Sequence, residues 1–461
     1  MSLTIAPAQI VEQSDSPLLS ASSEWSRAPL GDVATIINGY AFKSKQFVRE
    51  GGTPLIRIRD ITSDATSVGF VGDYESRYVV RPGDLLVGMD GDFNCARWRG
   101  PEALLNQRVC KIVPDPTRID LDYLTHILPP YLQAIHDLTS STTVTHLSSR
   151  DLALIPLPLP SLEEQHALAR VLTATSDRLR SSGAHLRAAR AAIASLRGAV
   201  LAAACSGRLT VDWRRVHPDA PSVTDALSAL GFSRTSKRRM RDAPLDLALP
   251  EMPSDYVVAS LGSTAEVLEY GTSVRCDSDA NGLPVLRMGN IQDGAVDLAD
   301  LKYCPRATDL GGLLLRSGDL LFNRTNSPEL VGKSAVFRGP ESMSFASYLI
   351  RVRFDPSIAH PDFVNYWINS TWGREWARLV KTDGVSQSNI NGSKLAQMPI
   401  PLPPIAEQKE VVARASAALA GADKILQRVA IATSGLEVAA QAVLARALTG
   451  DMQSGNAVGA A

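Results

Sequence analysis

Pro158-Leu-Pro-Ser-Leu-Glu-Glu-Gln165 occurs a second time in this chain, as Pro401-Leu-Pro-Pro-Ile-Ala-Glu-Gln408. Each copy is followed by a segment without proline, from about 163 to 205 and from about 406 to 448. Because proline fixes φ and removes a backbone donor, the Pro-rich part of each copy favours an extended chain. The sequence therefore predicts the same extended lead-in and long helix twice.

Both proline-free segments carry apolar residues at seven-residue steps, which is the spacing of a coiled-coil seam. Each predicted helix is roughly 60 Å long at about 1.5 Å per residue, and such a helix cannot bury its seam alone. We therefore expect the two helices to pack antiparallel against each other. The predicted seam consists of Leu172, Leu179, Leu186, Ile193 and Val200 in the first helix and Ile425, Val429, Leu436 and Val443 in the second, where Val411 and Ala418 precede Ile425 at the same step.

The regions before the two helices also match each other, block by block and in the same order. A Gly-Xaa-Pro-Xaa-Xaa-Arg block begins at Gly52 and again at Gly282, and Gly-Asp-Leu-Leu begins at Gly83 and again at Gly318. Short apolar runs between Gly, Pro, Asn and Asp turns indicate strands in both regions, with helices after them. The expected fold class is α+β, with two pseudo-symmetric mixed α/β domains joined by two long antiparallel coiled-coil helices.

The repeat also predicts where the parts divide. In chain order they are a disordered tail (1–23), domain 1 (24–154), a Pro-rich lead-in with the central long helix (155–207), a basic linker (208–250), domain 2 (251–397), a Pro-rich lead-in with the C-terminal long helix (398–450) and a second tail (451–461).

The composition of the chain is that of a folded, soluble protein. Of its 461 residues 45% are hydrophobic and 21% charged, and neither a signal peptide nor an uninterrupted membrane span is recognisable, so we expect a cytoplasmic protein without membrane contact. The five cysteines form no Cys-Xaa-Xaa-Cys pair and are expected to be reduced packing residues. The net charge of −1 argues weakly against nucleic-acid binding, but cations concentrate between Arg208 and Arg241.

At this point the sequence resembles the specificity subunit of type I restriction-modification systems, over nearly the whole chain from about Glu24 to Met452. The duplicated Pro-Leu-Pro motifs that open the long helices carry the resemblance, together with the Gly-Xaa-Pro-Xaa-Xaa-Arg and Gly-Asp-Leu-Leu blocks. Each motif alone is weak, but together, in duplicate and in order, they are specific.

The resemblance implies a DNA sequence-specificity subunit without a catalytic site. Each domain would read one half of an asymmetric, bipartite site in double-stranded DNA, and the paired helices would set the spacing between the halves. Two modification subunits would bind the helices and domains and methylate adenine N6. Two ATP-dependent restriction subunits would complete the nuclease. S-adenosylmethionine, ATP and Mg²⁺ would be used by these partners, and this chain would hold no cofactor or metal.

Neither two apparent enzyme motifs nor the histidines support catalysis by this chain. Leu128-Pro-Pro-Tyr131 looks like the motif of adenine methyltransferases, but Leu128 has no polar group to accept hydrogen bonds from the target amine. Gly332-Lys333-Ser334 ends as a phosphate loop does, but the first glycine of that loop is missing. The seven histidines form no metal-binding pattern, and we expect those at 126, 136 and 146 to be packing or surface residues.

Candidate DNA contacts are the polar and basic residues of the loops that repeat between the domains, because Arg and Lys bind guanine or phosphate and Asn and Gln pair with adenine. They are Tyr40, Lys43, Lys45, Arg57, Arg59, Thr145 and His146 in the first domain, and Arg287, Asn290, Asn323, Arg324, Asn326, Gln387, Ser388 and Asn389 in the second. Arg57 and Arg287 occupy the same position of the repeat, which indicates a shared structural or phosphate-binding role rather than base reading.

Two other classes of function remain as alternatives. A coiled-coil scaffold for protein partners would use the repeated loops to bind protein instead of DNA. A self-contained DNA-modifying enzyme would need a methyl-donor loop, which the sequence does not contain. The bases read and the length of the spacer do not follow from the sequence.

Overall fold

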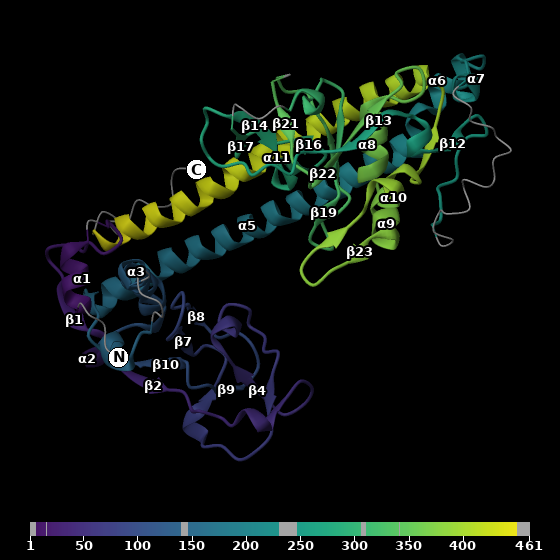
Figure 1. Ribbon diagram of the computed structural model, residues 1–461. Helices are drawn as coiled ribbons and strands as arrows, with labels where there is room; N and C mark the ends of the chain where they lie inside the picture. The colour runs from purple at the N-terminus through teal and green to yellow at the C-terminus, as the bar shows by residue number, and fades with distance from the viewer. Residues whose placement is uncertain are drawn as a thin grey trace. The chain divides into compact units, whose positions relative to one another are not determined.

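The computed structural model describes residues 6–14, 16–139, 146–229, 247–305, 310–340 and 342–449. The chain forms two compact units: unit 1 contains Met1–Arg187 and Ala430–Ala461, and unit 2 contains Ala188–Val429. The border between them cuts both long helices, α5 (Leu162–Cys205) and α11 (Ile405–Leu448), so each unit holds one part of each helix (Figure 1). The sequence-based division had treated each helix as a segment of its own.

Recognition domain 1, in unit 1, is built on two sheets. The first has the strand order β2-β10-β7-β8 and the second β3-β5-β4-β9-β6. The strands are β2 (Ala34–Asn38), β3 (Phe47–Val48), β4 (Thr53–Ile56), β5 (Gly69–Phe70), β6 (Val79–Val80), β7 (Leu85–Gly88), β8 (Cys95–Arg97), β9 (Ala103–Leu105) and β10 (Val109–Pro114). The helices are α2 (Leu30–Val33), α3 (Leu121–Thr139) and α4 (Ser149–Ala153).

Recognition domain 2, in unit 2, repeats this plan. Its main sheet has the order β13-β22-β18-β20, which places equivalent strands as in the first domain. In both domains one of the described strand pairs is parallel, β4 with β9 and β14 with β21, while the other strand pairs are antiparallel. The strands are β13 (Ala265–Tyr270), β14 (Leu283–Leu286), β15 (Ile291–Gln292), β16 (Ala295–Val296), β17 (Lys302–Cys304), β18 (Leu320–Asn323), β19 (Thr325–Asn326), β20 (Ser334–Val336), β21 (Ser344–Phe345), β22 (Leu349–Phe354), β23 (Thr382–Asp383) and β24 (Ser388–Asn389). The helices are α8 (Pro361–Asn369), α9 (Thr371–Val380) and α10 (Gly392–Ala396).

The repeated Gly-Asp-Leu-Leu block starts the central strand of each main sheet. Gly83 and Gly318 have φ values of 100° and 97°, a conformation that glycine adopts without strain. The aspartate that follows accepts a hydrogen bond from a backbone N–H of the same turn, Arg81 N at 2.8 Å in one domain and Arg316 N at 2.9 Å in the other. The repeated block therefore encodes the same tight turn into β7 and β18.

Each Pro-rich lead-in is a strand paired with the start of its own domain. In unit 1, β11 (Pro156–Leu159) pairs antiparallel with β1 (Ser26–Pro29), and in unit 2, β25 (Pro399–Leu402) pairs with β12 (Val257–Ser260). Both sheets have only two strands, which leaves an unpaired edge for the prolines, since they have no N–H to donate. The predicted extended lead-in is confirmed.

A buried glutamine at the start of each long helix ties the helix to its recognition domain. Gln165 accepts a hydrogen bond from Asp120 N at 2.8 Å and donates to Arg118 O and Pro160 O. Gln408 accepts from His360 N at 2.8 Å and donates to Ile358 O and Pro403 O. The last residue of the repeated motif thus makes the same three bonds twice.

Within each unit the helix parts run antiparallel. In unit 1, Leu168 and Leu172 near the start of α5 share a hydrophobic core with Ala447 and Leu448 at the end of α11. In unit 2, Cys205 at the end of α5 shares a core with Val411 and Ala415 near the start of α11. An ion pair between Arg197 and Asp423 joins the two helices there.

The buried face of α11 differs from the predicted seam at Ile425. Its side chain is 49% exposed, and Ala418 is exposed as well, whereas Ala415 and Ala422 are buried. The buried face therefore steps by seven through Ala415, Ala422, Val429, Leu436 and Val443, of which the last three are half-buried. The prediction was wrong at Ile425 because it continued the seven-residue step from Val411 through Ala418, whereas the buried face continues from Val411 through Ala415 and Ala422. In α5, Leu172 and Ile193 are buried and Leu179, Leu186 and Val200 are half-buried.

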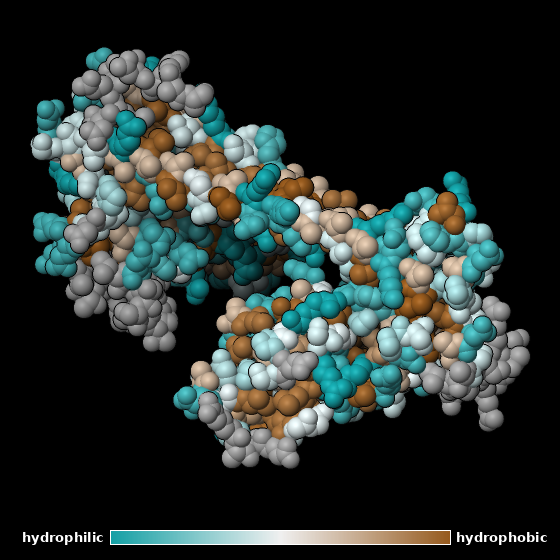
Figure 2. Space-filling model, turned by 90° about the horizontal axis from the view of Figure 1, so that it is seen from above, coloured by the Kyte–Doolittle hydropathy of each residue, from teal (hydrophilic) through white to brown (hydrophobic). Residues whose placement is uncertain are grey.

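Both long helices leave apolar side chains on the surface. Ile431 and Val438 of α11 and Leu196 of α5 are exposed, and Figure 2 shows apolar residues in patches among hydrophilic ones on the face it presents. Each helix also contains a stretch that is long and apolar enough to cross a membrane by length and composition alone, which is weak support for a membrane span.

The N-terminal segment is ordered where the structure describes it. Residues Pro7–Gln13 form α1, Ile10 and Leu19 are buried in the core of unit 1, and Ser22 N donates to Leu448 O at the end of α11. The prediction of a disordered tail over 1–23 was wrong for residues 6–14 and 16–23, because its few apolar residues are enough to anchor it. Residues 1–5, residue 15 and the tail 451–461 lie outside the described residues.

Two of the cysteines form a disulfide bond, between Cys276 and Cys304. The expectation that all five are reduced was wrong for this pair, because strand pairing brings together residues 28 positions apart. Cys95, Cys110 and Cys205 are free.

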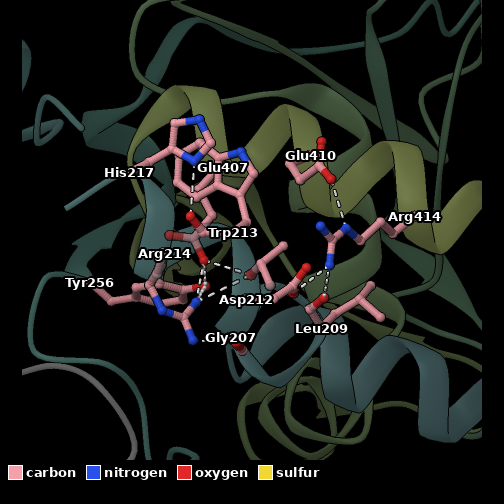
Figure 3. A network of polar contacts seen from close by, with 11 residues as sticks. Gly207, Leu209, Asp212, Trp213, Arg214, His217, Tyr256, Glu407, Glu410 and Arg414 are labelled. Carbon is pink, nitrogen blue, oxygen red and sulfur yellow. Dashed lines mark hydrogen bonds and ion pairs between the residues drawn. The ribbon is translucent and has the colours of Figure 1, made fainter. Parts of the chain in front are cut away.

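The described part of the basic linker folds against the start of α11. It contains α6 (Val211–Val216) and α7 (Thr224–Ala229). Figure 3 shows Arg214 paired with the fully buried Glu407, which also accepts hydrogen bonds from Thr210 at 2.6 Å and Tyr256 at 2.9 Å. Burial raises the pKa of Tyr256, with Glu407 adding to the effect, so the phenol stays protonated and donates. Arg214 is thus occupied by an acidic partner.

We predict that Glu407→Ala lowers the free energy of unfolding by about 3 kcal/mol, because it leaves the half-buried Arg214 and two hydroxyl groups without their shared acceptor. Urea denaturation of the purified protein measures this. Glu375→Ala, which removes an exposed partner of Arg378, serves as the control and should leave the midpoint nearly unchanged. Equal effects of the two substitutions would contradict the role given to Glu407.

Candidate nucleic-acid interface

A cavity of about 680 Å³ in recognition domain 2 is lined by an excess of cationic groups. It lies beside β14, β17 and β19, and we call it the basic cavity. Its charged lining residues are Arg275, Arg287, Lys302, Lys333 and the single carboxylate Asp300. An excess of cations around an open cavity is suited to a polyanion such as the phosphate backbone of DNA.

Arg287 is held at one wall of the basic cavity by the turn that follows β14. Its guanidinium donates to the Asp300 carboxylate at 2.9 Å, and its backbone N–H donates to Asn290 Oδ1 at 2.8 Å. Arg57 has the same arrangement in domain 1, where its backbone N–H donates to Asp60 Oδ2 at 2.9 Å. Both arginines therefore stabilise the turn after their strand.

Lys333 is one of three cations of the basic cavity that make no ion pair within the described residues, with Arg275 and Lys302. Its Nζ lies 3.3 Å from Gln292 Oε1. Burial lowers the pKa of Lys333, and nearby Arg374 lowers it further, while Asp293 acts in the opposite direction. A phosphate group would supply the counter-charge that this lysine lacks.

A polar strip formed by β19 and β24 borders the basic cavity. Asn326 lines the cavity, and its strand pairs with Ser388 and Asn389. The Arg324 guanidinium lies over the Tyr270 ring, 4.9 Å from its centre, and donates to Ser347 O at 3.2 Å and Asn389 Oδ1 at 3.4 Å. The structure thus brings together Arg287, Arg324, Asn326 and Asn389, with the exposed Gln387 next to them in sequence.

Three predicted contacts of domain 2 are buried, and the prediction was wrong for them. Asn290 uses its amide to hold the turn around Arg287, Asp297 and Asp300. Asn323 is fully buried and donates to Met288 O. Ser388 is buried and donates to Asp383. An amide or hydroxyl looks the same in sequence whether it faces solvent or closes a turn, which explains these errors.

In domain 1, the predicted residues near Tyr40 share an exposed surface. The Tyr40 ring contacts those of Phe42 and Tyr78, each with centroids 5.1 Å apart, and remains half exposed. Lys43 and Lys45 follow in the same loop and are exposed. This loop presents an aromatic face and two cations to solvent, a combination that suits contact with nucleic acid.

The other predicted residues of domain 1 lie on separate turns. Arg59 is exposed after β4, while Arg57 contacts Asp60 and Ser67. The His146 ring makes a 2.5 Å hydrogen bond with Asp90, and Thr145 lies outside the described residues. A cavity of about 390 Å³ in unit 1 contains none of these residues, and Arg97, Arg99 and Arg180 line it together with three aspartates.

The residues that sequence reasoning missed include three cations that line the basic cavity. Arg275, Lys302 and Lys333 stand at positions where the two domains show no shared motif, so the repeat did not point to them. The only signal was the basic character of each residue. The exposed Tyr348, which also lines the cavity, was missed for the same reason.

The apparent enzyme motifs fall on structural elements. Leu128-Pro-Pro-Tyr131 lies inside α3, where Leu128 is fully buried and the Tyr131 hydroxyl accepts a hydrogen bond from Arg27 at 2.7 Å. In the part of the chain that the structure describes, no group of three or more His, Cys, Asp or Glu side chains is placed to hold a metal ion.

Comparison with known proteins agrees with the observed fold. Residues 22–183 match the family model described as type I restriction modification DNA specificity domain. The specificity subunit of the type I restriction enzyme EcoBI from Escherichia coli is 34% identical to this chain over 455 residues, which cover 98% of this chain and 91% of the relative. The chain belongs to the specificity subunits of type I restriction enzymes. A second such subunit, that of EcoKI from Escherichia coli K12, is 25% identical and covers 93% of this chain and 89% of its own length.

A solved structure supports the fold of this specificity subunit. A chain from a type I R-M system, in a structure concerned with complex assembly and conformational transition, superposes with a TM-score of 0.60 at 18% identity. The match covers 94% of this chain and 99% of that chain. Because the chain belongs to the specificity subunits, it is the component that determines DNA sequence specificity, and members of this family are not catalytic.

We predict that Lys333→Ala in the assembled enzyme weakens binding to specific and unrelated duplexes by a similar factor. It should also reduce the slope of log affinity against log salt by about 1, as expected for one lost phosphate contact. Fluorescence anisotropy at several salt concentrations measures both quantities. Arg378→Ala is the matched control, because that guanidinium is already paired with Glu375 at 2.6 Å. A change in the preferred sequence at unchanged slope contradicts a phosphate contact.

Proposed function

We propose that this specificity subunit reads a bipartite, asymmetric DNA site, one half with each recognition domain. The observation that carries the proposal is the duplicated domain: the same strand order and the same parallel strand pair occur twice, around different loop sequences. A shared scaffold with different exposed side chains suits two domains that do the same task on different bases.

The long helices α5 and α11 set the spacing between the half-sites. Each contains 44 residues, and at about 1.5 Å per residue a helix of this length reaches beyond one turn of DNA, about 34 Å. The support for a fixed spacing is the rigid join of each helix to its domain, through the paired lead-in strand and the buried Gln165 or Gln408.

The exposed apolar residues of the helices fit a protein partner, since a stable monomer rarely leaves such residues aligned on one helix. Ile431 and Val438 are separated by seven residues and so lie on one face of α11. We assign this surface to two modification subunits, which would carry adenine N6 methylation with S-adenosylmethionine. Two ATP- and Mg²⁺-dependent restriction subunits would complete a cytoplasmic enzyme, and this chain would bind no cofactor.

The alternative function is a coiled-coil scaffold that binds only proteins. The exposed helix faces suit both functions, but the cationic excess of the basic cavity favours DNA. A scaffold would bind all DNA sequences equally or not at all.

The test of the spacing is an insertion of four residues after both Gly183 and Gly435, so that the two helices lengthen together. We expect both half-sites to stay the same and the spacer to grow by about two base pairs, and a seven-residue insertion to add about three. Sequencing of methylated adenines in the host genome reads out both features. An unchanged spacer contradicts the proposal.

The matched control for this experiment exchanges residues 24–154 for the recognition domain of another specificity subunit. We expect one half-site to change, while the other half-site and the spacer remain as they were. If both half-sites changed, the assignment of one half-site to each domain would be incorrect.

A further inference from the structure

Val385 stands at the tip of the hairpin that joins β23 to β24. Its relative exposure is 110%, and among the described large hydrophobic residues the next is Val216 at 71%. In Figure 1 this hairpin projects from the body of its domain. Single exposed apolar residues are common on protein surfaces, so the exposure matters only together with the setting of the hairpin.

Hydrogen bonds and strand pairing hold the hairpin in place on both of its strands. Gly384 N donates to Gln387 O at 2.8 Å, which closes the turn, and β24 pairs with β23 on one side and with β19 on the other. The Asp383 carboxylate accepts hydrogen bonds from Lys381 Nζ at 2.7 Å and from the buried Ser388 hydroxyl. Val385 is therefore presented at a fixed position.

The base of the hairpin is part of the strip that borders the basic cavity. Ile390 N donates to Arg324 O at 2.9 Å, and Asn389 Nδ2 donates to Thr325 Oγ1 at 2.8 Å. Asn326, on the strand next to β24, lines the cavity itself. A duplex whose phosphates contact the cavity therefore lies within reach of the hairpin.

The chemistry of the tip fits the major groove of DNA. That groove admits a two-stranded β-ribbon, and the apolar group it presents on base edges is the 5-methyl group of thymine. Lys381 neutralises Asp383, so the tip carries no unpaired carboxylate that would repel phosphates. Proteins that insert an apolar side chain between base pairs from the minor groove use Phe, Leu, Ile, Met or Pro, and most of these side chains are longer than valine. Valine therefore fits contact with a base edge better than insertion between base pairs.

We propose that Val385 contacts the methyl group of a thymine in the half-site read by recognition domain 2, and so helps to determine which sequence is bound. This inference rests on the proposed function, because it requires that the domain reads DNA. Residues 140–145 of domain 1, which correspond to this segment in the repeat, lie outside the described residues.

The test uses the assembled enzyme and its own site, defined by mapping methylated adenines. Each thymine of the two half-sites is replaced in turn by deoxyuridine, which removes only the methyl group. We expect one position, in one half-site, to lose affinity by about fourfold, the effect of one buried methyl group. Val385→Ala should weaken binding to the thymine duplex by a similar factor and should abolish the difference between thymine and uracil at that position.

Leu298→Ala is the matched control, because it truncates another exposed apolar side chain of the same domain and should leave the thymine dependence intact. The proposal is overturned if no thymine methyl affects binding, if the effect persists in Val385→Ala, or if the half-site contains no thymine on either strand. It is also overturned if Val385→Ala weakens assembly of the enzyme, measured by mass photometry, because the tip would then contact protein. If the wild-type enzyme showed no sequence preference at all, the proposed function itself would be refuted.

Discussion

The attachment of each recognition domain to a long helix depends on one buried glutamine. Gln165 and Gln408 each satisfy one backbone N–H and two carbonyl groups of the segments that meet there. Because unsatisfied buried polar groups are costly, no shorter or charged residue can replace the amide without loss. The direction in which a domain leaves its helix is thereby fixed by three hydrogen bonds, and any function that depends on spacing depends on them.

The second junction adds a charged contact that the first does not have. Glu407 is fully buried and binds Arg214, Thr210 and Tyr256, whereas the equivalent Glu164 is exposed and caps its own helix through Ser161. The repeat therefore conserves the backbone plan and the glutamine, while neighbouring positions adapt to different surroundings. In unit 2 the linker after α5 supplies those surroundings.

Periodicity and repetition predicted the architecture well, because they reflect backbone geometry that both copies share. The Pro-rich strands, the long helices and the matched Gly-Asp-Leu-Leu turns all follow from local sequence. The errors arose at positions where burial decides whether a side chain packs inside the fold or faces solvent. Ile425 was assigned to the seam because it continued a seven-residue step from Val411, although the step through Ala422 is the buried one. Asn290, Asn323 and Ser388 were predicted to contact DNA although their polar groups are used inside the fold. Lys302 and Lys333 reach the basic cavity only through strand pairing that no local pattern encodes.

The composition of the two units has a consequence for synthesis of the chain. Unit 2 is continuous, Ala188–Val429, whereas unit 1 combines Met1–Arg187 with Ala430–Ala461. Domains fold as they leave the ribosome. Synthesis of unit 1 begins first, but this unit is completed last, because its second segment follows unit 2 in the chain. The core that Leu168 and Leu172 share with Ala447 and Leu448 is complete only when the final turns of α11 have emerged. Nascent chains truncated near their end therefore lack a complete first unit while the second is already whole.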